Sequence, residues 1–395
     1  MTAAKTPQVV VVTGASAGVG RAIVRAFARR GAHIGLLARG RAGLEGARED
    51  VEQLGGQALV LPTDVADADQ VEAAAAAAVE RAFGPIDVWI NDAMCSVFSP
   101  IKEMTPADYR RVTEVTYLGF IHGTLAALKR MRPRNRGIVI QVGSALAYRG
   151  IPLQSAYCAA KHAVKGFCDS LRAELIHERS HVKITMVQMP ALNTPQFDWV
   201  KSRLPRKPQP APPIYQPEVA AEAVYWAAHH YRCEWFVGGS TAVVITGNKL
   251  LPGLGEWYLG RQGYDAQQYD GEVSPDRRNN VLAPVDDERD YGAHGDFGDR
   301  AKDFSYQLWL DQRRHWVLLS GLAGAVCGAV CGGLRRASRG GLAGLALGAL
   351  GTLALGAWTR GGMRGVPRVP EPPHPHDGPN SSLEQRRRNV TAPVA

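Results

Sequence analysis

The chain has 395 residues, 45% of them hydrophobic, which is enough for one sizeable α/β domain plus additional segments. Its formal charge is +9, but the part from Gln312 onward holds eleven arginines against three acidic residues and so carries +8 of that charge. The remaining body is close to neutral, which argues against nucleic-acid binding and assigns the positive charge to the tail.

Six cysteines, at positions 95, 158, 168, 233, 327 and 331, show neither a CxxC pair nor a histidine spacing suited to zinc. They are also too few for a disulfide scaffold, so we expect reduced thiols and no metal site. The N-terminal residues enter an apolar run without the charged, apolar and cleavable regions of a secretory signal. These features predict a catalytic body in a reducing, cytoplasmic compartment.

Short apolar runs alternate with helical patterns along the first 240 residues. Segments 19–32 and 71–84, between such runs, have the Ala, Glu and Arg content of helices and end at or beside a glycine. This alternation predicts βαβ units and therefore an α/β fold with a doubly wound, Rossmann-like parallel sheet of about seven strands. Ligands are expected at the carboxyl ends of the strands. The predicted strands are 9–13, 33–38, 58–64, 86–91, 137–143, 183–190 and the run "EWFVGG" from Glu234.

The first predicted strand leads into a turn that holds Gly14, Gly18 and Gly20, and the turn leads into a helix. Glycine permits the tight turn there and lets the backbone approach a pyrophosphate, whose charge faces the helix N-terminus. Three glycines alone are weak evidence, but between a strand and a helix they predict dinucleotide binding.

The second predicted strand ends at Ala38, where an NAD-preferring site usually carries an acidic residue, and Arg39 follows. An arginine suits a 2′-phosphate, so we predict NADP(H) as the cofactor. The alternative is a solvated surface arginine.

Regular patterning lapses from Pro190 to Pro213, where the proline-rich run "RLPRKPQPAPP" cannot continue a helix. Such a run is typical of a peptide-recognition segment or of a connector that frames a site, and we favour the connector. A helix is expected near 217–229. We predict a catalytic domain at 1–260, a poorly packed polar linker at 261–303, an apolar helical hairpin at 304–360 and a disordered basic tail at 361–395.

Two apolar runs, 316–334 and 341–358, are each about long enough for a ~30 Å hydrocarbon core. Their glycines recur every fourth residue, a spacing that lets membrane helices pack closely, so we predict a C-terminal Gly-rich hairpin that contacts the membrane through residues 316–358. A soluble hairpin docked on the body is the alternative. Three arginines between the runs, Arg335, Arg336 and Arg339, disfavour translocation, and a re-entrant or surface-lying hairpin removes that objection.

Tyr157 and Lys161 are four residues apart in a segment with helical composition, so their side chains share one face. This spacing alone is also typical of a surface aromatic–lysine pair. Together with other motifs it resembles the short-chain dehydrogenase/reductase family, over about residues 7–250. The other motifs are Thr13-Gly14-x3-Gly18-x-Gly20, Asp64-Val65, Asn91-Asp92-Ala93 and a Ser144 that precedes Tyr157 by thirteen residues.

The resemblance implies that Tyr157 is the general acid/base at a carbonyl or alcohol oxygen and that Lys161 favours its phenolate and holds the nicotinamide ribose. It implies that Ser144 donates a hydrogen bond to the reacting oxygen. The residues that it assigns to NADP(H) binding are Gly14, Ser16, Gly18, Val19, Gly20, Arg39, Asp64, Val65, Asn91, Ala93, Tyr157, Lys161, Pro190, Ala191 and Thr194.

Three positions depart from the family pattern. Thr116 stands where an asparagine usually holds a proton-relaying water chain, and its single hydroxyl is expected to alter that relay. Met94 replaces a usual glycine and is expected to crowd the cleft. The run "PALNTP" is one residue short, which leaves the contact to the nicotinamide amide open between Leu192 and Asn193.

These observations predict a membrane-associated, NADP(H)-dependent oxidoreductase that interconverts a ketone or aldehyde and an alcohol, with its catalytic domain in the cytoplasm. Leu146, Ile151 and Leu153 are expected to line the substrate side, which favours a hydrophobic or lipid-like substrate. The resemblance also implies a homo-oligomer. The alternative function is a membrane-tethered, NADP-binding scaffold or sensor with little turnover, which only Thr116 and Met94 favour.

Overall fold

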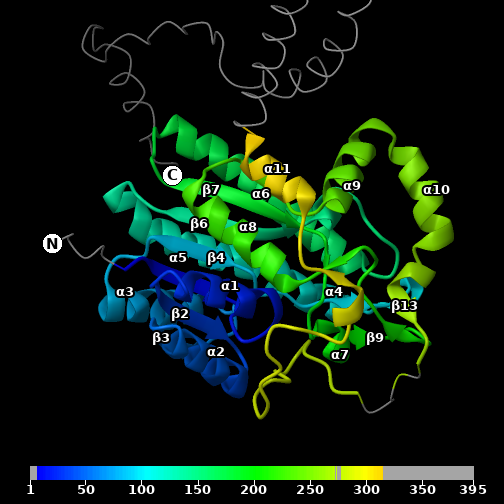
Figure 1. Ribbon diagram of the computed structural model, residues 1–395, viewed down its shortest axis with the longest axis horizontal. Helices are drawn as coiled ribbons and strands as arrows, with labels where there is room; N and C mark the ends of the chain where they lie inside the picture. The colour runs from blue at the N-terminus through cyan, green and yellow to red at the C-terminus, as the bar shows by residue number, and fades with distance from the viewer. Residues whose placement is uncertain (1–6, 272, 274–276, 315–395) are drawn as a thin grey trace, which may run out of the picture. The chain divides into compact units, whose positions relative to one another are not determined.

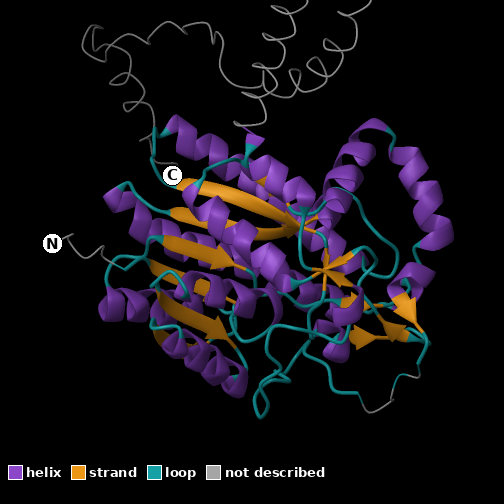
Figure 2. Cartoon of the chain, in the orientation of Figure 1, coloured by secondary structure: helices purple, strands orange, loops and turns teal. Residues whose placement is uncertain are grey.

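The computed structural model describes residues 7–271, 273 and 277–314. In this part of the chain, seven parallel strands form the central sheet in the order β3-β2-β1-β4-β6-β7-β12 (Figures 1 and 2). The predicted doubly wound sheet is confirmed, whereas the predicted Gly-rich hairpin lies almost wholly outside the described residues. The strands are β1 Val9–Thr13, β2 His33–Ala38, β3 Gln57–Pro62, β4 Val88–Asn91, β6 Ile138–Ser144, β7 Lys183–Met189 and β12 Glu234–Phe236.

Helices cover both faces of this sheet, and strand β1 shows why its first four residues are all apolar. Val10 and Val12 belong to the core under one layer of helices, while Val9 and Val11 belong to the core under the other. Successive side chains of a strand point to opposite faces, so a sheet buried on both sides needs a continuous apolar run. One layer contains α1 Gly18–Ala28, α2 Arg41–Gln53 and α8 Pro217–His229, and the other contains α3 Ala77–Phe83, α4 Pro106–Thr113, α5 Gly119–Arg134 and α6 Ser155–His177.

Two π-helical segments, Gln70–Ala76 and Glu114–Leu118, lead into α3 and α5. The sequence patterns predict ordinary helix at the first of these, whereas the structure has the wider π winding there. The remaining short elements are β5 Val97–Phe98 and the 3₁₀ turns Ile101–Glu103, Ala145–Ala147, Asp265–Gln267 and Gly298–Arg300.

The proline-rich region after β7 forms short pieces that pair with the C-terminal part of the body. Strand β11 lies between β8 and β14, parallel to both, and β10 pairs with β13. Helices α9 and α10 follow β12 and line one end of the cavity described below. The elements are β8 Ala191–Leu192, α7 Gln196–Trp199, β9 Lys201–Ser202, β10 Lys207–Pro208, β11 Ile214–Tyr215, α9 Gly239–Leu250, α10 Pro252–Gln262, β13 Gln268–Tyr269, β14 Ala301–Lys302 and α11 Tyr306–Gln312.

Residues 277–302, which we call the strap, differ from the poorly packed linker that their polar composition predicts. Val281, Ala293 and Phe297 of the strap are buried, and β14 ends it by pairing with β11. Strap carbonyls accept hydrogen bonds from the N–H groups of Gly18 and Gly43. A polar segment packs well here because its backbone and carboxylates satisfy donors of the body, a partnership that composition does not reveal.

Within residues 7–271, 273 and 277–314, no helix combines the length and the hydropathy needed to cross a bilayer. The two apolar runs of the predicted membrane hairpin, 316–334 and 341–358, lie outside this part of the chain, as does the tail at 361–395. Their assignments stay predictions.

Candidate active site

A cavity of about 790 Å³ opens at the carboxyl ends of the central strands. It runs from the glycine-rich turn after β1, past the ends of β2, β4 and β6, to the helices α9 and α10. This is the edge at which a doubly wound sheet binds its ligands.

The glycine-rich turn is shaped to hold a nucleotide close to the backbone. Gly14 and Gly18 have φ angles of +73° and +59°, a region that side chains rarely adopt. A Cβ on Gly20 would lie 2.1 Å from the Gly14 carbonyl oxygen, so only glycine lets α1 start so near the turn. Helix α1 has no acidic residue in its first turn and no capping side chain on Ala17, so its positive dipole end favours an anion, although the Gly18 N–H already donates to the Gly292 carbonyl. Of the predicted residues here, Gly14, Ser16, Gly18 and Val19 line the cavity.

Ser144, Tyr157 and Lys161 lie together on this cavity. Ser144 ends β6, Tyr157 is in the first turn of α6, and a hydrogen bond joins their hydroxyls. The Lys161 ammonium donates a 2.7 Å hydrogen bond to the Val142 carbonyl oxygen and lies 5.6 Å from the centroid of the Tyr157 ring. The structure therefore brings Ser144, Tyr157 and Lys161 together at one cavity, as the sequence predicts.

The electrostatics of Tyr157 differ from the expected effect of Lys161. Burial raises the pKa of Tyr157 above its ordinary value, and the hydrogen bond from Ser144 opposes that rise. Burial also lowers the pKa of Lys161, to about 8, because an ammonium loses its hydration there. In the described structure, Ser144 is thus the residue that favours the phenolate.

Asp92 is a functional-site residue that sequence reasoning missed. Its carboxylate lines the cavity and accepts a hydrogen bond from the Gly20 N–H group. Burial raises the pKa of Asp92 to about 7, and the nearby Lys161 ammonium counteracts this rise. A carboxyl directly after a buried strand, on the ligand-binding edge of the sheet, was the available signal.

Asn91 and Thr116 are not among the residues that line the cavity, and for Asn91 this corrects the prediction that it lines the cleft. The Asn91 amide is fully buried and hydrogen-bonds Trp89 at 2.8 Å and Gln141 at 2.9 Å, so it links strands β4 and β6. Thr116 is buried as well, and its hydroxyl hydrogen-bonds the backbone N–H and carbonyl of Cys95. Thr116 therefore fixes the chain just after Met94, which does line the cavity.

At the end of the cavity formed by β2 and β3, Arg39, Asp64, Val65 and Ala93 are all lining residues, as predicted. Arg39 donates hydrogen bonds to the carbonyls of strap residues 280, 281 and 282. Asp64 forms an ion pair with Arg111 at 2.5 Å. A guanidinium has five N–H groups, so these carbonyls leave two on Arg39 for a ligand.

The opposite end of the cavity is lined by residues from the "PALNTP" run and from α9 and α10. Pro190, Ala191, Leu192 and Thr194 line it, whereas Asn193 donates to Gln216 and accepts from the Phe297 N–H group. Leu146 and Ile151 line it as expected, but Leu153 packs in a separate core with Phe98 and Phe197. Lining residues that the sequence patterns did not reveal are Val243, Val244, Leu251, Leu254, Trp257 and Tyr258.

Comparisons with known proteins agree with this arrangement. Residues 8–203 match the family model for short chain dehydrogenase. The uncharacterized oxidoreductase YxnA of Bacillus subtilis is 31% identical over 270 residues, which cover 68% of this chain and 76% of that protein. A fatty acyl-CoA reductase of Acinetobacter baylyi is 32% identical over 225 residues, which cover 56% of this chain and 72% of that protein.

Among solved structures, a short-chain dehydrogenase from Streptomyces avermitilis superposes with a TM-score of 0.54 and 25% sequence identity. That match covers 66% of this chain and 99% of the other. The sequence relatives, the matched fold and the glycine turn beside Ser144, Tyr157 and Lys161 agree with one another. The chain belongs to the short-chain dehydrogenase family of oxidoreductases.

Proposed function

We propose that this chain is an NADP(H)-dependent oxidoreductase that interconverts a ketone or aldehyde and an alcohol on a hydrophobic or lipid-like substrate. The observation that carries the proposal is that Ser144, Tyr157 and Lys161 line the same cavity as the glycine-rich turn. The close approach of Gly20 to Gly14 fits a nucleotide at that turn, because a Cβ on Gly20 would clash with the Gly14 carbonyl and push the start of α1 away from the turn.

In the reductive direction, a bound nicotinamide supplies hydride to the substrate carbon. Tyr157 gives its phenolic proton to the carbonyl oxygen, and a neutral phenol is the form that its raised pKa favours. Ser144 donates a hydrogen bond where negative charge develops on that oxygen. The hydrogen bond between Ser144 and Tyr157 favours the phenolate form that Tyr157 takes after the transfer, whereas the Lys161 ammonium, held at the Val142 carbonyl, is proposed to hold the nicotinamide ribose.

The preference for NADP(H) is supported by Arg39, which lines the cavity beyond the end of β2 and keeps two N–H groups for a ligand. An arginine at this place pairs with a 2′-phosphate. The substrate class is supported by the apolar lining from Leu146, Ile151, Leu254 and Trp257. It is also supported by the similarity to a fatty acyl-CoA reductase.

The purified full-length chain tests this proposal directly. With NADPH we expect turnover of long-chain aldehydes and of long-chain or ring ketones, and lower kcat/KM with NADH. The measurement is the loss of nicotinamide absorbance across a panel that also holds small polar carbonyls. Turnover of the small polar carbonyls alone would contradict the proposed substrate class.

Replacing Asp92 by asparagine tests the electrostatics of the site. The carboxylate raises the pKa of Lys161, so its removal is expected to move that pKa below about 8. If the ammonium is needed, the alkaline fall of kcat/KM then begins at lower pH than in the wild type. The measurement is a pH–rate profile, and the control is Asp169→Asn on α6, whose carboxylate pairs with Lys165 away from the cavity. An unmoved alkaline limb would mean that Asp92 does not act on Lys161.

The proposal includes membrane contact through residues 316–358, with the catalytic domain in the cytoplasm. It also includes a homo-oligomer. The homo-oligomer is proposed from the family resemblance. The support for membrane contact is the length of the two apolar runs and the recurrence of glycine at every fourth residue. Sedimentation with lipid vesicles tests it: the full chain should co-sediment, and a chain that ends at Arg314 should not.

A further inference from the structure

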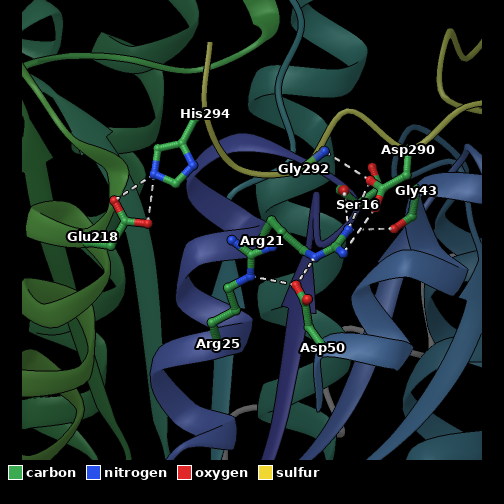
Figure 3. A network of polar contacts seen from close by, with 9 residues as sticks. All are labelled: Ser16, Arg21, Arg25, Gly43, Asp50, Glu218, Asp290, Gly292 and His294. Atoms are coloured by element: carbon green, nitrogen blue, oxygen red, sulfur yellow. Dashed lines mark hydrogen bonds and ion pairs between the residues drawn. The ribbon is translucent and has the colours of Figure 1, made fainter. Parts of the chain in front are cut away.

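Strap residues Asp290 and His294 contact Arg21 of α1 and Glu218 of α8, as Figure 3 shows. The buried Arg21 guanidinium forms an ion pair with strap residue Asp290 at 3.1 Å and another with Asp50 of α2. The Gly292 carbonyl accepts a 3.0 Å hydrogen bond from the Gly18 N–H group, and His294 lies 3.0 Å from Glu218 of α8. The strap therefore has a defined position beside the glycine-rich turn.

The strap also caps helix α2, which has no capping side chain of its own because its N-cap residue is Gly40. The Asp287 carboxylate accepts a 3.0 Å hydrogen bond from the backbone N–H of Arg41, and the Asp287 carbonyl accepts one of 3.2 Å from the backbone N–H of Ala42. The Asp286 carbonyl accepts one from Gly43 at 3.0 Å. These bonds satisfy N–H groups that a helix start leaves unpaired.

The same contacts bring the Asp286 side chain to the end of the cavity beyond β2. Asp286 is 8% exposed and lines the cavity together with Ser16 and Arg39. A Cβ on Gly40 would lie 1.9 Å from one of its carboxylate oxygens, and a Cβ on Gly43 would lie 2.7 Å from the other. The strap thus places a carboxylate where Ala38, at the end of β2, provides none.

We propose that Asp286 is a cofactor-selectivity residue, which acts against Arg39 by disfavouring a 2′-phosphate and accepting a hydrogen bond from a 2′-hydroxyl. This inference rests on the proposed function, in which Arg39 attracts the phosphate of NADP(H). A carboxylate and a phosphate repel each other at short range, whereas a hydroxyl can donate to the carboxylate. The selectivity of the chain is therefore a balance between one side chain that follows β2 and one that the strap supplies.

Titration calorimetry with 2′,5′-ADP and 5′-AMP tests the inference, because these ligands differ by the 2′-phosphate and contain no nicotinamide. Asp286→Asn in the full chain is expected to raise the affinity for 2′,5′-ADP relative to 5′-AMP by about tenfold, since a repulsive charge is replaced by an amide. The matched control is Asp287→Asn, which caps the same helix from an exposed position and does not line the cavity. It should leave the ratio within about twofold of the wild type, and thermal unfolding confirms that each variant is folded.

The outcomes separate this inference from the proposed function. If Asp286→Asn leaves the ratio unchanged while the wild type prefers 2′,5′-ADP, the inference is wrong and the NADP(H) proposal stands. If the wild type shows no preference but Asp286→Asn shifts the ratio tenfold, the inference stands and the NADP(H) preference is wrong. An equal shift in Asp287→Asn, or no binding of either ligand to any chain, would overturn the inference.

Discussion

Replacing Tyr157 by phenylalanine is expected to lower kcat by about 10³-fold, the size of effect that a positioned proton donor contributes. The phenyl ring keeps the packing of α6 against the cavity but lacks the hydroxyl that hydrogen-bonds Ser144. NADPH affinity should stay within about twofold, because the glycine-rich turn and Arg39 are unchanged. Steady-state kinetics and a fluorescence titration with NADPH measure the two quantities.

Tyr148→Phe is the matched control for this variant. The Tyr148 hydroxyl donates to Glu234, and Tyr148 is not among the residues that line the cavity. We expect this variant to lose stability, because the half-buried Glu234 carboxylate keeps the Gln188 amide but loses its other hydrogen-bond donor, while kcat stays close to the wild-type value. A Tyr157→Phe variant with wild-type turnover would instead favour an NADP-binding sensor, in which the hydroxyl has no chemical role.

Replacing Gly20 by alanine is expected to lower NADPH affinity by at least about 100-fold and to reduce the free energy of unfolding by roughly 3 kcal/mol. The added Cβ would lie 2.1 Å from the Gly14 carbonyl oxygen and 2.9 Å from a carboxylate oxygen of Asp92. The nearest of these atoms belongs to backbone, so α1 has to move away from β1 and the turn loses its shape. NADPH titration and urea unfolding measure both effects.

Gly166→Ala on α6 controls for the general effect of adding a methyl group to a helix. A Cβ at Gly166 would meet nothing within 4 Å, and the residue is exposed. This variant should gain roughly 0.5–1 kcal/mol in the free energy of unfolding, because alanine has the higher helix propensity. Wild-type affinity for NADPH in Gly20→Ala would mean that the close approach of α1 is not required for binding.

Much of the fold and part of the site could be predicted because the signals are local. A strand buried on both faces needs a nearly continuous apolar run, and β1 shows this in its four buried valines, Val9 to Val12. The distance of four residues between Tyr157 and Lys161 places them on one face of α6 whatever surrounds it. The spacing of the glycines between a strand and a helix predicts the turn, and Gly14 and Gly18 there have the positive φ angles that glycine adopts readily.

Other assignments failed or were missed because contacts distant in sequence decide them. Asn91 and Ala93 belong to the same sequence motif, but the Asn91 amide hydrogen-bonds Gln141, 50 positions along the chain. Asn91 therefore does not line the cavity. Asp92 becomes a site residue because α6 brings Lys161 near it. Trp257 and Tyr258 of α10 line the same cavity as residues at the ends of β1, β4 and β6, a proximity that only the folded chain produces.

The sequence by itself determined the parallel sheet, the glycine-rich turn and the shared face of Tyr157 and Lys161, since each depends on the periodicity or conformation of neighbouring residues. Only the tertiary structure decided that residues 277–302 pack as a strap and that Asp286 lines the same cavity as Arg39, some 250 positions away. The physical reason is that a polar segment is held there by hydrogen bonds to unpaired backbone donors of α1 and α2. Those donors exist only once the helices have formed, and no pattern within the segment encodes where they lie.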